Sequence, residues 1–521
     1  MNTLKDYVNF KLTHADKVAE AEGYPLTMQN CKKYKKMKDL KVYGNSLQDG
    51  TPTPDAPVEV VSVGEKSVNL FDKDNVKYSN LIYLSTIGKF VTADNSNVRM
   101  YYIECTPNTT YTYSKSLGIY NGLYSSESIP DNGVEVTNVS NNGTITTGAN
   151  DKYLAIYPLS SSELDTISYG EIEKDIQIQL GTTATPYEPY GKYKIPVVQR
   201  GINLFSMAKV NAESKTVSGL TFTPLDDERV YVKGTATANA YYYMYAKATK
   251  NMVLKSGTYK SKPFKKSEIS ILFNMRYMDG TGAGNLNSMH SGVTYNNDIY
   301  IESALVYVAK GTVMDDIIEL QLMEGTENLP YEPYIEPVTT NIFLDEPLRK
   351  LGDYADYIDF KENKVVRKIK EVVFKGGEVT NKYTSYESSL GYTLFHTPHN
   401  KYPDVNMINF EKYDGHPELS THFKAETRLD SSKIKDGEWY VFRFGIWIAF
   451  DVGKYETPAE VNAWLTSQYE NGTPVTFNYI LAEPTEEPLN IDLPKLTTKT
   501  TIIEVDTSLA PSNIYGKYIK K

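Results

Sequence analysis

The sequence predicts a mainly β protein made of tandem antiparallel β-sandwich domains of a jelly-roll-like kind, with a short N-terminal helix and one helix in the C-terminal domain. Short stretches that alternate apolar and polar residues are separated by Gly, Pro, Asn and Asp, a pattern typical of strands and turns. The phrase YEPY occurs twice, at residues 187–190 and 331–334. Each copy lies about 120–130 residues after an NLF triplet, at residues 69–71 and 203–205, and this spacing suits one β-sandwich.

Length and composition limit the classes of protein that the chain can belong to. A chain of 521 residues predicts three or four domains, and its 40% hydrophobic and 23% charged residues are typical of folded ones. The net charge of −10 argues against a nucleic-acid-binding protein, which would carry a basic face. Cys31 and Cys105 are the only cysteines, so neither a disulfide framework nor a cysteine zinc site is expected. The sequence shows no signal peptide and no long apolar stretch, which predicts synthesis in a cytoplasm without membrane insertion.

The repeated phrases divide the chain into five predicted segments. The first holds a helix at 3–22, whose narrow apolar stripe could pack on a neighbouring protein, on copies of itself or on the domain that follows. The predicted segments are an N-terminal helix and linker for attachment at 1–40, a first β-sandwich at 41–198, a second at 199–338, a third β-rich domain with one helix at 339–488, and C-terminal strands at 489–521.

The closing strand of each sandwich is expected just before YEPY. Residues 175–180 alternate strictly between apolar and polar, as a strand with one buried face does. The corresponding stretch at 318–325 is interpreted as longer by two residues, Met323 and Glu324, and an insertion of two preserves the face of each neighbouring side chain. We expect the first Tyr of YEPY to pack on this strand and the Pro to fix the direction in which the chain leaves. A third unit begins near Asn341, where NIF resembles the NLF triplet.

The C-terminal domain contains the clearest internal helix, in residues 457–472. Thr457 is the expected N-cap, Pro458 suits the first helical position, and Glu460 completes a capping box, while an Asn-Gly pair ends the helix. Residues 439–451, WYVFRFGIWIAFD, are apolar on both faces and predict one central strand covered on both sides.

Phrases at the domain junctions resemble one class of proteins. LKVYGNSLQDGTPTPDAPVEVVSVGEKSVNLFD (40–72) resembles a stretch found in tail and baseplate proteins of phages that infect Gram-positive bacteria, and LGTTATPYEPYGKYKIPV (180–197) resembles the closing phrase of their β-sandwich modules. Residues 341–374, 473–489 and 502–518 resemble the C-terminal parts of such proteins. The resemblance implies a virion protein of the tail tip or baseplate, with modules of the carbohydrate-binding kind. Its partners would be other tail or baseplate proteins and a host cell-wall or surface polysaccharide.

The best candidate for a carbohydrate-binding surface is AYYYMYAK (240–247). If this stretch is a strand, Tyr241, Tyr243 and Tyr245 share one face, where they could stack on sugar rings. The alternative is a strand with one face in the core and these tyrosines half-buried. Similar but weaker tyrosine pairs occur at residues 101–102 and at positions 111 and 113. The three tryptophans, by contrast, lie in apolar or helical settings typical of a core: Trp439, Trp447 and Trp464.

Residues that suggest metal binding or catalysis have simpler explanations. His396, His399, His416 and His422 lie close together, but we expect ordinary histidines of an exposed loop and no metal site. DKDN at 72–75 resembles a calcium loop only faintly, and no cofactor is expected, although calcium in a β-sandwich stays open.

A carboxylate pair for glycoside cleavage is sought among Asp353, Asp356 and Asp359. Residues three apart on a strand point to opposite faces, so the trio is not expected to converge. The sequence therefore predicts a non-enzymatic protein.

Two functions fit these features. The first is a tail or baseplate protein that binds host carbohydrate, with multivalent display that favours an oligomer and, by analogy with tail fibres, a homotrimer. The second is a purely structural baseplate or tail-tip protein that makes only protein contacts. An enzyme that degrades wall or capsule polysaccharide is a third and weaker possibility, because no carboxylate pair supports it.

Overall fold

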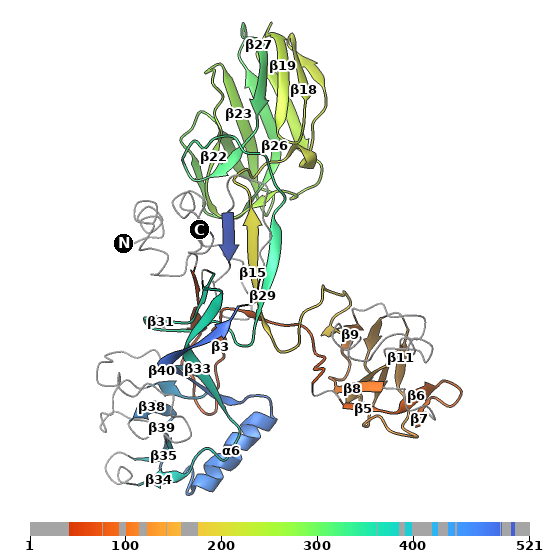
Figure 1. Ribbon diagram of the computed structural model, residues 1–521, viewed down its shortest axis with the longest axis vertical. Helices are drawn as coiled ribbons and strands as arrows, with labels where there is room; N and C mark the ends of the chain where they lie inside the picture. Colours follow the sequence, from red (N-terminus) through yellow and green to blue (C-terminus); the bar gives the residue numbers. More distant parts are fainter. Residues whose placement is uncertain are drawn as a thin grey trace. The chain divides into compact units, whose positions relative to one another are not determined.

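The computed structural model describes residues 41–74, 77–92, 100–113, 122–141, 143–157, 176–360, 362–384, 391–398, 419–425, 436–442, 445–489, 491 and 502–505. The predicted N-terminal helix and the two residues His399 and His416 lie outside this set. The described chain is mainly β, with many antiparallel sheets and one α-helix among the described residues, which confirms the predicted fold class (Figure 1). Its contacts divide it into two compact units, 64–195 with 342–347, and 1–63 with 196–341 and 348–521.

The first sandwich consists of two facing sheets around an aromatic and aliphatic core. Phe71, Tyr101, Leu154 and Ile178 belong to this core and are all but fully buried. One sheet has the order β11 (Asn138–Ser140), β10 (Gly122–Ser126), β13 (Tyr153–Tyr157), β8 (Met100–Glu104), β5 (Lys77–Ser79), and the other has the order β12 (Thr144–Thr146), β9 (Thr110–Tyr113), β14 (Ile178–Leu180). A hairpin of β6 (Leu81–Leu84) and β7 (Lys89–Thr92) is separate from both.

The second sandwich is larger and has the clearest two-layer core. Phe222 of one sheet stacks on Tyr242 of the other, with ring centroids 4.8 Å apart and planes within 5°. The first sheet has the order β16 (Val210–Asn211), β20 (Ala240–Ala246), β26 (Ile299–Val308), β23 (Ile269–Tyr277), β24 (Gly282–Asn287), with β21 (Val253–Leu254) also paired to β26. The opposite layer contains β17 (Lys215–Val217), β18 (Leu220–Pro224), β19 (Arg229–Thr235), β27 (Val313–Glu319), and a short sheet of β25 (Val293–Tyr295), β22 (Gly257–Ser261), β28 (Leu322–Glu324).

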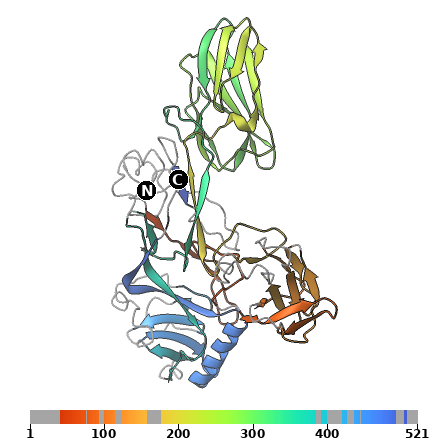
Figure 2. The ribbon, with the colours of Figure 1, turned by 45° about the vertical axis from the view of Figure 1, so that its right-hand side comes forward.

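The C-terminal domain combines two sheets with the helix. The helix α6 (Pro458–Glu470) is the blue coil of the ribbon (Figure 1 and Figure 2). It is capped by Thr457, whose side chain accepts from the N–H of Glu460, and its buried Val461 and Leu465 pack into the core. The predicted caps Thr457 and Asn471 are confirmed, but the capping box is not, because the Glu460 carboxylate accepts from the N–H of Glu456 (2.6 Å) instead of that of Thr457. One sheet has the order β1 (Lys41–Tyr43), β32 (Tyr357–Asp359), β33 (Lys364–Phe374), β40 (Val475–Pro488), β36 (Leu419–Ser420). The other has the order β34 (Asn381–Tyr383), β35 (Tyr392–Pro398), β39 (Gly445–Asp451), β38 (Glu438–Phe442), β37 (Lys424–Ala425).

Three sequence-based predictions about these elements are wrong. Residues 439–451 form a hairpin of β38 and β39 instead of one strand; Gly445 begins β39 at φ 141°, where a Cβ would lie 1.8 Å from the carbonyl oxygen of Thr397. Residues 41–63 do not belong to the first sandwich, because β1 pairs with β32 of the C-terminal domain. The NIF triplet at Asn341 does not repeat the NLF structure, because it lies inside strand β29 (Val338–Leu344) with Asn341 exposed.

A set of buried hydrogen bonds made by Asn69, Gln177 and Glu188, which we call the polar clasp, explains why the opening and closing phrases of the first sandwich recur. The side chain of Asn69, in the NLF triplet, is buried and donates to the carbonyl of Ile176 (3.0 Å). Its amide oxygen accepts from the N–H groups of Phe71 (2.9 Å) and Ile178 (3.2 Å). The amide also donates to the carbonyl of Glu188 (3.1 Å), so one side chain satisfies four backbone groups where the first and last segments meet.

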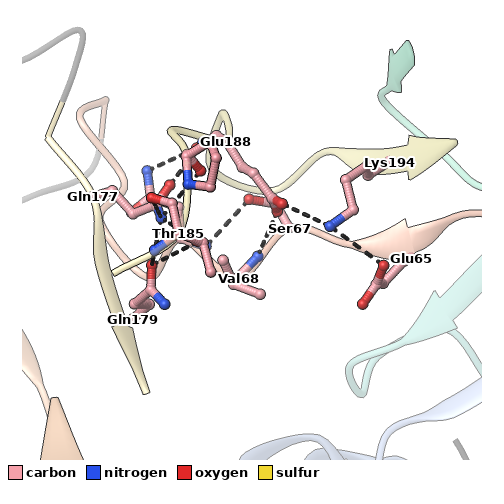
Figure 3. Close-up of polar contacts among 10 residues, drawn as sticks. Glu65, Ser67, Val68, Gln177, Gln179, Thr185, Glu188 and Lys194 are labelled. Carbon is pink, nitrogen blue, oxygen red and sulfur yellow. Dashed lines mark hydrogen bonds and ion pairs between the residues drawn. The ribbon is translucent and has the colours of Figure 1, made fainter. Parts of the chain in front are cut away.

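The glutamate of YEPY closes the clasp from the other side. The N–H of Glu188 donates to the side-chain oxygen of Gln177 (2.7 Å), and its carboxylate accepts from the N–H of Val68 (3.1 Å) and from Lys194 (2.7 Å) (Figure 3). Glu188 is only 6% exposed, whereas Tyr187 is 42% exposed. The buried polar contacts with the closing strand therefore come from the neighbouring Glu, while the Tyr187 ring is only partly covered.

The second sandwich repeats the clasp with the same atoms. Asn203 donates to the carbonyl of Leu320 (3.2 Å) and accepts from the N–H groups of Phe205 (3.1 Å) and Leu322 (3.2 Å).

The YEPY glutamate of the second copy also binds the closing strand as the first does. The N–H of Glu332 donates to the side-chain oxygen of Gln321 (2.9 Å), and both the Gln–Glu pairs are 11 residues apart. The two copies therefore align without a gap here, and the predicted insertion of Met323 and Glu324 is wrong.

Candidate functional site

The predicted tyrosine strand exists and points its row of rings outward. In β20, Tyr242 and Met244 face the core, and they are 2% and 0% exposed. Tyr241, Tyr243 and Tyr245 alternate with them and are 47%, 44% and 56% exposed. The prediction that these three share one face is confirmed, and about half of each side chain is accessible.

The neighbouring strand β26 supplies a fourth ring and holds the row in place. Tyr307 lies opposite Tyr241, with ring centroids 5.3 Å apart and planes inclined by 53°. Tyr243 and Tyr245 are parallel, at 5.7 Å and 9°. We call Tyr241, Tyr243, Tyr245 and Tyr307 the tyrosine face. Because the rings restrain one another, a ligand that binds them loses little side-chain entropy on the protein side.

Beyond the rings, the same outer surface becomes polar. The register of β20, β26 and β23 places Tyr245, Ser303 and Asn274 in one row across the sheet, and the Asn274 amide donates to the Ser303 hydroxyl (2.6 Å). Asn285 of β24 lies next in this row and is exposed. Ser303 is only 1% exposed, so the polar groups that this surface offers beside the rings are the amides of Asn274, which is partly buried, and of Asn285.

This arrangement suits a flat ligand with apolar faces and a polar rim. Tyrosine offers a large apolar ring with a hydroxyl at its tip, and the adjoining amides offer both donors and acceptors. A pyranose ring has the matching chemistry, with C–H groups on its faces and hydroxyls around its edge. Tyr307 and Asn274 were missed by sequence reasoning, because only the strand register shows that they share the surface of β20.

Three of the four other predicted tyrosine candidates belong to the core of the first sandwich, and Tyr102 is partly buried. Tyr101, Tyr111 and Tyr113 are 1%, 3% and 7% exposed, and burial raises the pKa of the Tyr113 hydroxyl far above its ordinary value. Trp439 and Trp447 are buried too, as the sequence predicts, and Trp464 is partly buried against the core of the C-terminal domain.

Of the four clustered histidines, the two that the structure describes, His396 and His422, are core residues instead of loop residues, which corrects the expectation of an exposed loop. His396 is 3% exposed on β35, with a ring nitrogen 3.2 Å from the Asn381 amide, and His422 is 1% exposed beside the Thr421 hydroxyl (2.9 Å). Burial lowers the pKa of His422, an effect that a hydrogen bond with Gln468 partly offsets.

The aspartate trio is divided among unlike surroundings. Asp356 is fully buried and accepts from the N–H groups of Arg349 (3.0 Å), Lys368 (2.7 Å) and Ile369 (3.0 Å). Its carboxylate therefore holds two backbone segments together. Asp353 is exposed.

No group of three or more His, Cys, Asp or Glu residues within the described ranges is arranged to hold a metal ion. In the 72–75 stretch, Asp72 accepts from the N–H of Asp74 (3.0 Å), which is a local turn, and residue 75 lies outside the described ranges. Nor does any helix in the described part of the chain have the length and apolarity needed to cross a membrane.

Comparison of the chain with family models, with curated proteins and with solved structures found no match.

Proposed function

We propose that the chain is a non-enzymatic carbohydrate-binding protein whose tyrosine face holds a host surface polysaccharide. The observation that supports this most is the row of three exposed tyrosines on β20, beside the amides of Asn274 and Asn285 in the same sheet. Aromatic rings on a strand form a flat and rigid platform, and rigid platforms bind extended polymers with a small entropy cost.

The setting we propose is the tail tip or baseplate of a phage that infects Gram-positive bacteria. The phrases at the domain junctions support it by resemblance. A single weak glycan contact gains strength when several copies act together, so we further propose a homotrimer that binds other tail or baseplate proteins. The mass of the purified chain in solution, measured by light scattering, tests the oligomer independently of ligand binding.

Binding of the full-length chain to arrays of bacterial cell-envelope glycans, and to whole Gram-positive cells, tests the carbohydrate proposal. Tyr243→Ala removes the ring at the centre of the row and should weaken binding about tenfold, which is typical for loss of one aromatic anchor. Tyr190→Ala is the matched control, because Tyr190 is a 45% exposed tyrosine of the first sandwich.

Two outcomes would count against the proposal. Equal binding by Tyr243→Ala and Tyr190→Ala would place the ligand elsewhere on the chain. Failure of the wild-type oligomer to bind any glycan or cell would favour the purely structural baseplate role, in which the sandwiches contact only proteins.

A further inference from the structure

A pocket of about 280 Å³ opens beside the second sandwich, separate from the tyrosine face. Its walls come mainly from four stretches of chain that the fold brings together: the end of β15 (Tyr193–Arg200), residues 203–209, the loop and strand at 251–255, and residues 334–337 at the end of the second closing phrase. Leu204, Met252 and Ile335 supply apolar surface.

The charged groups around the pocket are mainly cationic. Arg200, Lys209 and Lys255 line it, and of the described residues that line it Glu336 alone is acidic. Arg200 is paired with Glu324 (3.0 Å) and Lys255 with Asp298 (2.6 Å), but neither carboxylate lines the pocket.

Each of the three lining cations is therefore paired with a carboxylate, so the pocket offers fixed donors and not a net positive charge. Arg200 is 8% exposed and the side chain of its partner Glu324 is 15% exposed, so both charges of this pair are screened less than surface charges.

Glu336 occupies the position that an anionic ligand would take. Its carboxylate accepts from the ammonium of Lys209 (2.9 Å) and from the hydroxyl of Tyr334 (2.8 Å). Lys209 also donates to the Tyr334 hydroxyl (3.0 Å), so the two donors are held in fixed positions. The Glu336 side chain is 69% exposed, against 28% for Lys209. The cation is thus built into the wall, while its carboxylate partner lies at the rim and can leave.

The ionisation of this pair agrees with that geometry. Burial acts to lower the pKa of Lys209, but hydrogen bonds with Glu336 and Tyr334 outweigh it and raise the pKa above its ordinary value. The hydrogen bond from Lys209 lowers the pKa of Glu336. Both groups are charged at neutral pH, so a competing anion meets a protonated lysine.

We propose that this pocket binds a small oxyanion, a carboxylate or a phosphate group, which displaces Glu336 from Lys209 and Tyr334. The apolar walls formed by Leu204, Met252 and Ile335 would contact the carbon skeleton that carries the anion. This site differs from the tyrosine face and does not depend on it.

Calorimetric titration of the full-length chain at low ionic strength tests the proposal, with sodium glucuronate and inorganic phosphate as separate probes. If only glucuronate binds saturably, the pocket is a carboxylate site, and if only phosphate does, it is a phosphate site. If both bind, the pocket is a general oxyanion site. Lys209→Met should weaken binding about tenfold, as expected for loss of a charge-assisted hydrogen bond. Glu336→Gln should do the opposite and tighten binding, because it removes the internal competitor.

Matched controls separate these effects from a change in net charge. Lys233→Met and Glu327→Gln alter exposed residues outside the pocket by the same charges and should leave binding unchanged. Tyr243→Ala should also leave it unchanged, which separates this site from the proposed polysaccharide site. Absence of binding to both probes by the wild type and by Glu336→Gln would overturn the proposal, as would weaker binding by Glu336→Gln than by the wild type.

Discussion

The polar clasp gives the sharpest prediction about stability, for the variant Asn203→Ala. Asn203 is 1% exposed and satisfies the N–H groups of Phe205 and Leu322 and the carbonyl of Leu320. Alanine leaves all three without a partner at a buried site. Each unsatisfied group costs about 1–3 kcal/mol, and water entering the gap would recover part of the total, so we expect a loss of roughly 3–5 kcal/mol. That is a large fraction of the stability of a typical domain, which is about 5–15 kcal/mol.

The effect should be confined to one sandwich, and this makes it measurable in the full-length chain. Hydrogen exchange read by mass spectrometry reports the free energy of opening peptide by peptide. Protection should fall by about two to three and a half powers of ten in peptides covering 203–206 and 318–324, since about 1.4 kcal/mol corresponds to tenfold. Asn69→Ala should produce the same loss in the first sandwich, and exposed Asn328→Ala should produce none.

Two results would refute the reasoning about the clasp. One is wild-type protection of both peptide groups in Asn203→Ala, which would mean that the buried backbone groups find other partners. The other is an equal loss in both sandwiches, which would mean that Asn203 does not act locally.

Three further predictions concern the C-terminal domain. Burial lowers the pKa of His422, so the folded state binds fewer protons than the unfolded state. The stabilising contribution of neutral His422 is complete above about pH 6.5 and is lost as the pH falls through its lower folded pKa. Urea unfolding should therefore become easier from pH 7 to 5, and this change should be smaller in His422→Gln. Thr457→Ala removes the N-cap of α6 and should cost about 1 kcal/mol in the same assay, with faster exchange in the first helical turn. Gly445→Ala would place a Cβ 1.8 Å from the carbonyl oxygen of Thr397, and we expect a loss of at least ~3 kcal/mol or failure of the domain to fold; normal unfolding of this variant would contradict the hairpin geometry.

Local patterns in the sequence predict much of this structure. The period-two alternation of β20 places Tyr241, Tyr243 and Tyr245 on one face, and burial of Tyr242 and Met244 follows from the same pattern. The ends of α6 follow from capping chemistry, which involves only neighbouring residues.

Features set by distant partners could not be predicted in this way. Nothing in residues 41–43 indicates that they pair with 357–359, because register depends on which sheet has an open edge. The stretch 439–451 is apolar throughout, so periodicity cannot distinguish one long strand from a hairpin. The clasp was missed for a related reason: Asn69 and Gln177 are polar, and only the fold shows that they are buried and satisfied.

The tyrosine face is tested most directly by a footprint of the bound polysaccharide on the full-length chain. Tyrosines would be nitrated with and without host polysaccharide, and each modified position would be quantified by mass spectrometry. The proposed function predicts that Tyr241, Tyr243 and Tyr245 are protected by the ligand, while the similarly exposed Tyr190 and Tyr469 react equally in both samples. Equal nitration of the three β20 tyrosines with and without bound polysaccharide would contradict it.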